Sequence, residues 1–217
     1  MLLTPIVYDG QLQRRLMPGD VLCGFEPALP ATDAASGITF TANNLLSSTY
    51  VRNPAGASTD SYPSADVLIS ALQAGLGLAY GLPVGLSFRW RIVNLSAFLL
   101  TGQMFSNTGG TLVRGTVPAS TTKDFLIQIT NGTPLQTVPQ LTFVNASPVI
   151  SGFTAAQIAL LSPGMVVTNA IANFQGQTIL GVNATALTVT MSINSNTSSA
   201  GNSVTFSPTY TVTGLGA

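Results

Sequence analysis

The stretch with the clearest potential for binding chemistry lies at residues 86–94 and reads LSFRWRIVN. Phe88 and Trp90 alternate there with Arg89 and Arg91, and aromatic residues between arginines can stack bases while the arginines bind phosphates. The whole chain, however, carries seven basic and seven acidic residues, so it lacks the basic surplus typical of a nucleic-acid binder. We therefore expect no nucleic-acid partner.

The same two arginines have a simpler use as partners of carboxylates. Only Arg114 and Lys123 could extend a basic surface around them, whereas pairing with a carboxylate needs a single acidic neighbour. We therefore expect Arg89 and Arg91 to lie on a solvent-facing or intersubunit surface. Their expected partners are Asp60, Asp66 or Asp124.

Enzyme chemistry has few candidate groups in this sequence. The chain has no histidine and one cysteine, Cys23, so neither a Ser-His-Asp site, a Cys-His site nor a zinc site of the usual kind can be built. Asp60 and Asp66 are a close pair of carboxylates, and such a pair can serve a glycosidase. Asp60 as a turn residue and Asp66 as an acid in the first turn of a helix would, however, both be explained without a catalytic role. We expect a protein that is not an enzyme and has no cofactor or metal.

Charged residues make up only 6% of the chain, whereas a soluble domain usually has about 25%. No charged residue follows Asp124, and the rest of the chain is rich in Ser, Thr, Asn, Gln and Gly. Two interpretations fit this composition. The second half is a compact β domain that tolerates neutrality, or its surface is packed within an assembly.

Residues 1–22 are predicted to form an extended N-terminal arm. Two short apolar pieces end at the turn residues Asp9–Gly10 and Pro18–Gly19, and neither piece has a closing strand. We therefore expect the arm to contact a partner rather than the protein's own core. The arm has no basic segment at its start and is interrupted early by Asp9, so we do not expect it to be a signal peptide. The candidate contact residues of the arm are Leu2, Ile6, Tyr8, Leu12, Arg14, Arg15 and Leu16.

Residues 23–134 are predicted to form a β-sandwich domain with one amphipathic helix near residues 64–74. Val67, Leu68, Ala71 and Leu72 share one face of this helix, which is expected to end at Gly75. The uncharged run 67–88 is long enough to cross a bilayer, but its glycines, proline and mixed periodicity argue against a membrane span.

The strand at residues 86–94 follows that helix and alternates with a period of two. Its aromatic face is expected to point inward, opposite the arginines. The predicted core residues on this face are Phe88, Trp90 and Ile92.

Residues 138–217 are predicted to form a second, small β module after a linker at Thr133–Pro139. Its one helix candidate starts at Thr154 as N-cap and stops at Pro163–Gly164. Short alternating runs separated by turn residues make up the rest. The expected fold class is all-β, a mainly antiparallel, jelly-roll-like sandwich or barrel with one or two short helices in two β modules.

Three phrases of the sequence resemble structural proteins of tailed-bacteriophage virions. The opening resembles the start of small virion proteins, and it reads IVYDGQLQRRLMPGDVL. The middle resembles β proteins associated with phage heads or fibres, in RNPAGASTDSYPSADVLISAL, SFRWRIVN and STTKDFLIQITN. The third phrase is similar to a β module of phage structural proteins and begins VISGFTAAQIALLSPGMVV.

This resemblance implies a capsid decoration, or cement, protein that strengthens the phage head without doing chemistry. The implied partners are the major capsid protein and further copies of the chain in a homotrimer, with no membrane involved. The implied location is the outer capsid surface of the virion, after synthesis in the cytoplasm of the bacterial host. A tail-fibre or receptor-binding component that recognises host glycans is the alternative.

Overall fold

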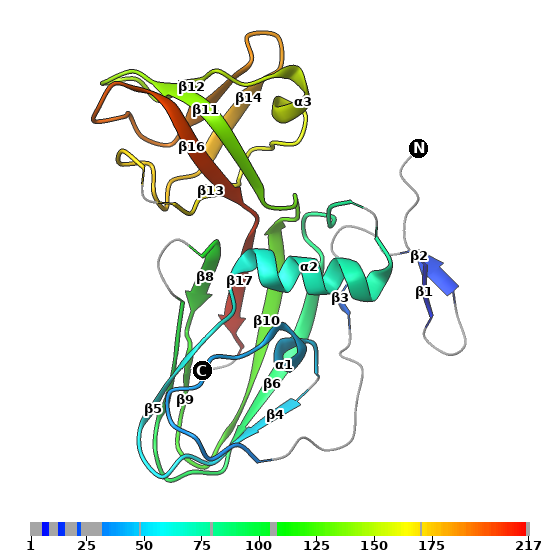
Figure 1. Ribbon diagram of the computed structural model, residues 1–217. Coiled ribbons are helices and arrows are strands. Elements are labelled where there is room, and N and C mark those ends of the chain that lie inside the picture. The colour runs from blue at the N-terminus through cyan, green and yellow to red at the C-terminus, as the bar shows by residue number, and fades with distance from the viewer. Residues whose placement is uncertain are drawn as a thin grey trace.

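A computed structural model of the protein describes residues 32–215, apart from residues 48, 79, 105–107 and 170, together with the backbone of three short N-terminal strands. The described chain is built mainly of strands and forms two β modules, one below the other in Figure 1. The predicted all-β fold in two modules is confirmed. The described residues contain three short helices rather than the one or two expected.

The first module is centred on a mixed sheet. Its strands follow the order β3-β6-β10-β17-β8. β4 pairs with the same edge of β6 as β3 does, but farther along β6. β6 is antiparallel to β10 but parallel to β3 and β4, and β17 is parallel to β8. The strands are β3 (Val21–Leu22), β4 (Thr49–Arg52), β6 (Ser87–Asn94), β8 (Gly110–Val113), β10 (Thr122–Asn131) and β17 (Thr209–Gly214).

The predicted alternation of β6 is confirmed by burial. Phe88, Trp90 and Ile92 lie in the core, while Arg89 and Arg91 are exposed on the opposite face. Trp90 packs edge-on against the ring of Phe40, at 4.9 Å between ring centroids. Further aromatic rings around Trp90 come from Tyr62 and Phe125.

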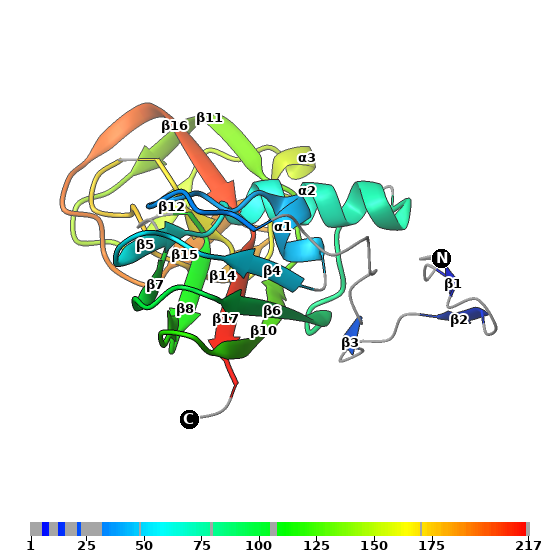
Figure 2. The ribbon, with the colours of Figure 1, turned by 90° about the horizontal axis from the view of Figure 1, so that it is seen from below.

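A smaller sheet and two helices cover the inner face of the main sheet. The smaller sheet has the order β5-β7-β9, and α2 lies across one end of the main sheet (Figures 1 and 2). Both helices contribute buried apolar residues to the same core as the strands. These elements are α1 (Ala42–Leu46), β5 (Ser58–Ser61), α2 (Ala65–Leu76), β7 (Leu100–Gln103) and β9 (Thr116–Val117).

The bounds of α2 differ from the prediction at its C-terminal end. The helix continues through Gly75 and ends at Gly77, whose φ of 63° is the left-handed conformation that glycine adopts at low cost. Val67, predicted on the inner face, is 48% exposed, because the buried stripe follows the spacing i, i+3, i+4, i+7 from the first helical residue. The buried residues of α2 are Ala65, Leu68, Ile69 and Leu72.

The second module is a small antiparallel barrel. Its strand order is β13-β16-β11-β12-β15-β14, and a bridge between Val166 and Thr178 joins the two ends of this order. The Ile179 N–H also donates to the Met165 carbonyl at 2.8 Å, so the described strands close on themselves. They are β11 (Gln136–Phe143), β12 (Val149–Ser151), β13 (Val166–Val167), β14 (Ile179–Asn183), β15 (Thr188–Met191) and β16 (Ser199–Ser207).

The barrel interior is filled by aliphatic and aromatic side chains. α3 (Ala155–Ile158) begins after Thr154, as predicted, with a capping box between Thr154 and Gln157. Its Ile158 is buried with the strand residues. The fully buried members of this core include Leu141, Ile150, Met165, Val167, Phe174, Val189, Val204 and Phe206.

The last strand corrects the predicted boundary of the second module, 138–217. β17 leaves the barrel after Pro208 and lies between β10 and β8 in the main sheet of the first module. Tyr210 and Val212 are buried there. The barrel is therefore an insertion between two paired strands, and the first module consists of β3, residues 32–134 and β17 (Figure 1).

The N-terminal segment is described only through the backbone of its strands. β1 (Ile6–Tyr8) and β2 (Gln13–Arg15) form an antiparallel hairpin, and β3 pairs with β6, so the end of the predicted arm joins the main sheet. The candidate residues Leu2, Leu12 and Leu16 lie outside the described residues. That the arm contacts a partner stays a prediction.

Candidate interaction surface

The two carboxylates considered as a catalytic pair have separate structural roles. Asp66 lies in the first turn of α2, as expected. Asp60 was expected in a turn, but it is a buried residue of β5 and forms two hydrogen bonds with the Arg52 guanidinium. The Nε–Oδ2 and Nη2–Oδ1 distances are both 2.8 Å. Because its oxygens are held by Arg52, Asp60 is not available as an acid or base toward a substrate.

Arg52 is the centre of a buried ionic cluster that the sequence did not reveal. Its side chain is fully buried, and Nη1 also donates to the Asp33 carbonyl at 3.1 Å and lies 3.3 Å from Asp33 Oδ1. Ser58 accepts from Nη2 at 3.1 Å and donates to Asp60 at 2.6 Å. The cluster thereby joins the loop at Asp33 to β4 and β5.

Tyr50 extends this cluster toward the surface. Its hydroxyl donates to Asp33 Oδ2 at 2.8 Å. Burial, followed by this hydrogen bond to a carboxylate, raises the pKa of Tyr50 to about 12. Burial opposes the ionised form of Asp33, but the backbone N–H of Ala35, the Tyr50 hydroxyl and Arg52 outweigh it, and the pKa of Asp33 is lowered. At neutral pH Asp33 is therefore a carboxylate that accepts a hydrogen bond from the protonated hydroxyl of Tyr50.

Of the partners expected for the arginines of β6, the structure places Asp124 beside Arg91. Arg91 Nε donates to Asp124 Oδ1 at 2.6 Å and Nη2 donates to Oδ2 at 3.1 Å, across the paired strands β6 and β10. Arg89 lies exposed on the same strand face. Lys123, which could have extended a basic surface, donates instead to the carbonyls of Arg114 and Thr116.

In the described part of the chain, no group of three or more His, Cys, Asp or Glu residues lies close enough to hold a metal ion. None of the described helices is long and apolar enough to span a membrane.

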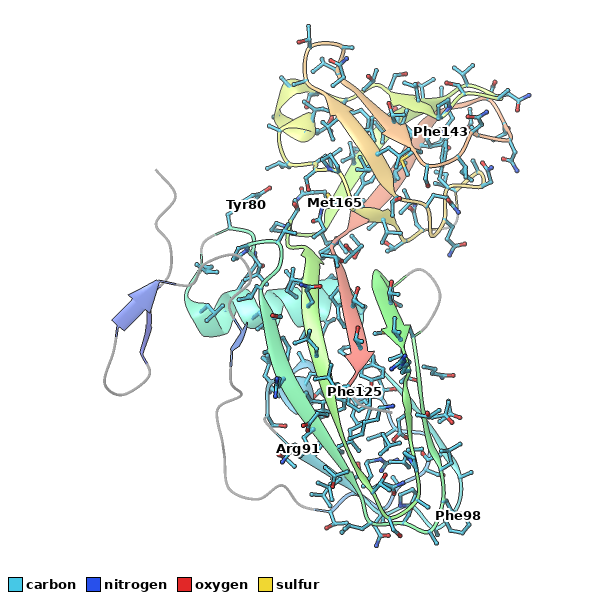
Figure 3. The ribbon with its side chains drawn as sticks, turned by 180° about the vertical axis from the view of Figure 1, so that it is seen from behind. Tyr80, Arg91, Phe98, Phe125, Phe143 and Met165 are labelled. Carbon is cyan, nitrogen blue, oxygen red and sulfur yellow. The ribbon has the colours of Figure 1, made fainter. Side chains whose placement is uncertain are left out.

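One apolar feature of the surface is the connection between β6 and β7, which we call the distal tip and define as Leu95–Leu99. Three large apolar side chains are exposed within these five residues: Leu95 is 54%, Phe98 42% and Leu99 48% exposed. Figure 3 shows Phe98 at the end of the first module that is farthest from the barrel. Single exposed apolar residues are common, but a cluster at one end of a module marks a candidate binding surface.

The tip is held in its conformation by the buried side chain of Asn94. Asn94 Nδ2 donates to the carbonyls of Phe98 at 2.8 Å and Pro118 at 2.9 Å. Its Oδ1 accepts from the Ser96 N–H at 3.0 Å and from the Ser96 hydroxyl at 2.7 Å. The buried side chains of Asn94 and Ser96 therefore fix the backbone that presents the exposed apolar residues. A loop that is already ordered loses less conformational entropy when it binds a partner.

The loops around the tip carry no charge. The N–H groups of Leu95 and Asn94 donate to the carbonyls of Arg52 and Thr121, so the loops at 53–57 and 118–121 lie beside the tip. Neither loop contains a charged residue, and none lies between Arg91 and Arg114. The end of the module is thus an uncharged surface with a preorganised apolar centre.

Sequence reasoning did not select the distal tip, although the sequence carries a signal for it. The run Phe98-Leu99-Leu100 breaks the polar–apolar alternation, and a half-buried strand can bury only every second residue of such a run. Only Leu100 is buried. Asn94 and Ser96, which hold the turn, were not predicted either, because their contacts depend on the three-dimensional arrangement of two loops.

Comparisons with protein-family models, with curated proteins and with solved structures find no match to this chain. The candidate surface is therefore defined by its own geometry: an uncharged, preorganised, apolar tip at one end of a two-module β protein.

Proposed function

We propose that the protein is a non-enzymatic decoration protein of a tailed-bacteriophage capsid, which binds the outer surface of the head as a homotrimer and stabilises the shell. The observation that carries this proposal is the preorganised apolar tip, which suits attachment to another protein and performs no chemistry. The resemblance of three sequence phrases to phage virion proteins supplies the virion as the setting.

The shell would be stabilised because binding of the protein is thermodynamically coupled to assembly of the capsid. A protein that binds the assembled shell but not the free capsid subunits adds its binding free energy only to the assembled state. A trimer over a junction of capsid subunits engages several subunits at once, so its three contacts act together as one multivalent attachment. A closed ring built from one repeated contact leaves no unpaired adhesive face.

The proposal is tested by comparing heads made with and without the protein. Light scattering of the purified protein should give about three times 22.3 kDa. Heads lacking the protein should assemble but release DNA at lower temperature, and the copy number per virion should approach that of the capsid protein. A few copies per virion, with heads equally stable in its absence, would favour the tail-fibre alternative.

A further inference from the structure

We infer that the distal tip is the part of the molecule that enters its protein partner, and that it does so by inserting Leu95, Phe98 and Leu99 into an uncharged apolar pocket. The inference rests on the proposed function in one respect, because that function makes the pocket part of the capsid shell. The predicted contact through the N-terminal arm is a separate attachment.

The absence of charge on the tip and on its neighbouring loops favours a pocket without charge. A charged pocket would lose its hydration on binding and gain no partner from the tip or from the loops at 53–57 and 118–121, and such a mismatch weakens binding strongly. Arg52, which directly precedes the loop at 53–57, is fully buried and already paired with Asp60. Lys123, which follows the loop at 118–121, donates to the carbonyls of Arg114 and Thr116.

The size of the tip argues against a second copy of this chain as the occupant. The three exposed side chains together present on the order of 300 Å². A stable interface buries about 800 Å² per partner, so two tips that meet end to end would not hold together. A pocket that encloses the tip on several sides also buries the rims of the neighbouring loops.

The composition of the tip argues against a lipid surface. Attachment to an anionic bilayer relies on lysines and arginines, and interfacial anchoring relies on tryptophan and tyrosine. Residues 92–113 contain none of these four residue types. The rigidity provided by Asn94 and Ser96 suits a pocket of fixed shape better than a fluid surface.

The test uses the full-length protein and heads that lack it. The double variant Phe98→Ser/Leu99→Ser removes apolar surface at exposed positions, and Leu180→Ser changes an even more exposed leucine, 62% exposed, on β14 of the barrel. We expect the double variant to bind heads at least about tenfold more weakly, and Leu180→Ser to bind as the unmodified protein does. Circular dichroism, Trp90 fluorescence and the melting temperature should be the same in all three proteins.

Salt dependence supplies a second measurement. Because the tip contact is uncharged, the difference in head binding between the unmodified protein and the double variant should change little between about 0.05 and 0.5 M NaCl. Phe98→Glu should weaken binding further than the serine variant, since it places an unpaired charge in the pocket.

The possible results separate the inference from the proposed function. Equal head binding by the double variant and the unmodified protein would overturn the role of the tip and leave decoration intact. Failure of the unmodified protein to bind heads would overturn decoration itself. Tip-dependent binding to phosphatidylcholine vesicles, or tip-dependent self-association in sedimentation velocity, would overturn the protein pocket in favour of a lipid or a second copy.

Discussion

The two modules are both built of β-strands, yet they differ in closure and in charge. The first has an open mixed sheet whose outer strand β8 pairs on one side, and every charged residue between positions 32 and 215 belongs to it. The barrel at residues 136–207 contains no ionisable side chain. An open sheet presents unpaired backbone groups at its edges, and charged residues hinder association through such edges.

This difference indicates that closing a sheet into a barrel can prevent association through its edges, as charged residues do on an open sheet. The barrel strands join end to end through the Val166–Thr178 bridge, so the described barrel offers no long edge to another chain. Hydroxyl and amide side chains are then sufficient to hydrate its surface. Barrel closure gives a direct physical reason for the first interpretation of the uncharged half, a compact domain that tolerates neutrality. The lack of charge is therefore not by itself an argument that this half is packed within an assembly.

The largest expected effect comes from the ionic cluster, which the barrel lacks. Arg52→Met should lower the free energy of unfolding by about 3–5 kcal/mol, because it leaves the buried Asp60 carboxylate without its partner. Urea unfolding followed by fluorescence measures this loss in the first module, since Trp90 is the only tryptophan of the chain.

A matched double variant sharpens this comparison. In Arg52→Met/Asp60→Leu both charges are gone, so much of the loss should be regained if the unpaired charge is its cause. If the double variant is as unstable as the single one, the cluster stabilises through Asp33 and Ser58 rather than through the ion pair.

The sequence was sufficient to predict features that depend on local periodicity. The alternation around Trp90 placed its strand face correctly, and Thr154 correctly marked the start of α3. The end of α2 was missed by two residues, because two glycines are available and only Gly77 adopts a positive φ.

Features that depend on distant partners could not be predicted. β17 alternates as the barrel strands do, and alternation does not indicate which sheet a strand joins. Asp60 resembles a turn residue until β4 and β5 bring Arg52 against it. The distal tip needed the same long-range knowledge, since Asn94 binds the carbonyl of Pro118.

An intermediate effect is expected where the two modules meet. The buried Asn131 Nδ2 donates to Ser162 Oγ at 2.9 Å and to the Pro163 carbonyl at 2.8 Å, and its Oδ1 accepts from the Thr133 N–H. Asn131→Ala should cost about 1–3 kcal/mol, because these partly buried groups lose their partner. Hydrogen exchange at residues 161–164 should become faster.

The control for this contact is an asparagine with a similar role inside the barrel. Asn169 donates to the Ser203 carbonyl at 2.8 Å and accepts from the Thr205 N–H at 2.9 Å, but its contacts are less buried. Asn169→Ala should leave exchange at residues 161–164 unchanged. If the two variants alter those residues equally, Asn131 does not connect the modules specifically.

The smallest effect is expected from the exposed pair Arg91–Asp124, and it should depend on pH. The hydrogen bond from Arg91, together with the charges of Arg91 and Arg89, lowers the pKa of Asp124 despite partial burial. The unfolded state therefore binds the proton more readily than the folded state. The stabilisation is present above the ordinary carboxyl value of 3.8 and is lost as the pH falls through the lower folded pKa.

Asp124→Asn should accordingly cost about 0.2–1 kcal/mol at pH 7, the range of exposed ion pairs, and its stability should converge with that of the unmodified protein as the pH falls below 3.8.

The barrel offers a neutral cross-strand counterpart, Thr137 and Thr205, whose hydroxyls are 3.1 Å apart. Replacing both with valine should give a change in stability that is the same at every pH, because residues 136–207 cannot titrate. If the stability change of this barrel variant did depend on pH, the titrating groups of the first module would also govern the stability of the barrel. The two modules would then differ in composition but would not unfold independently of each other.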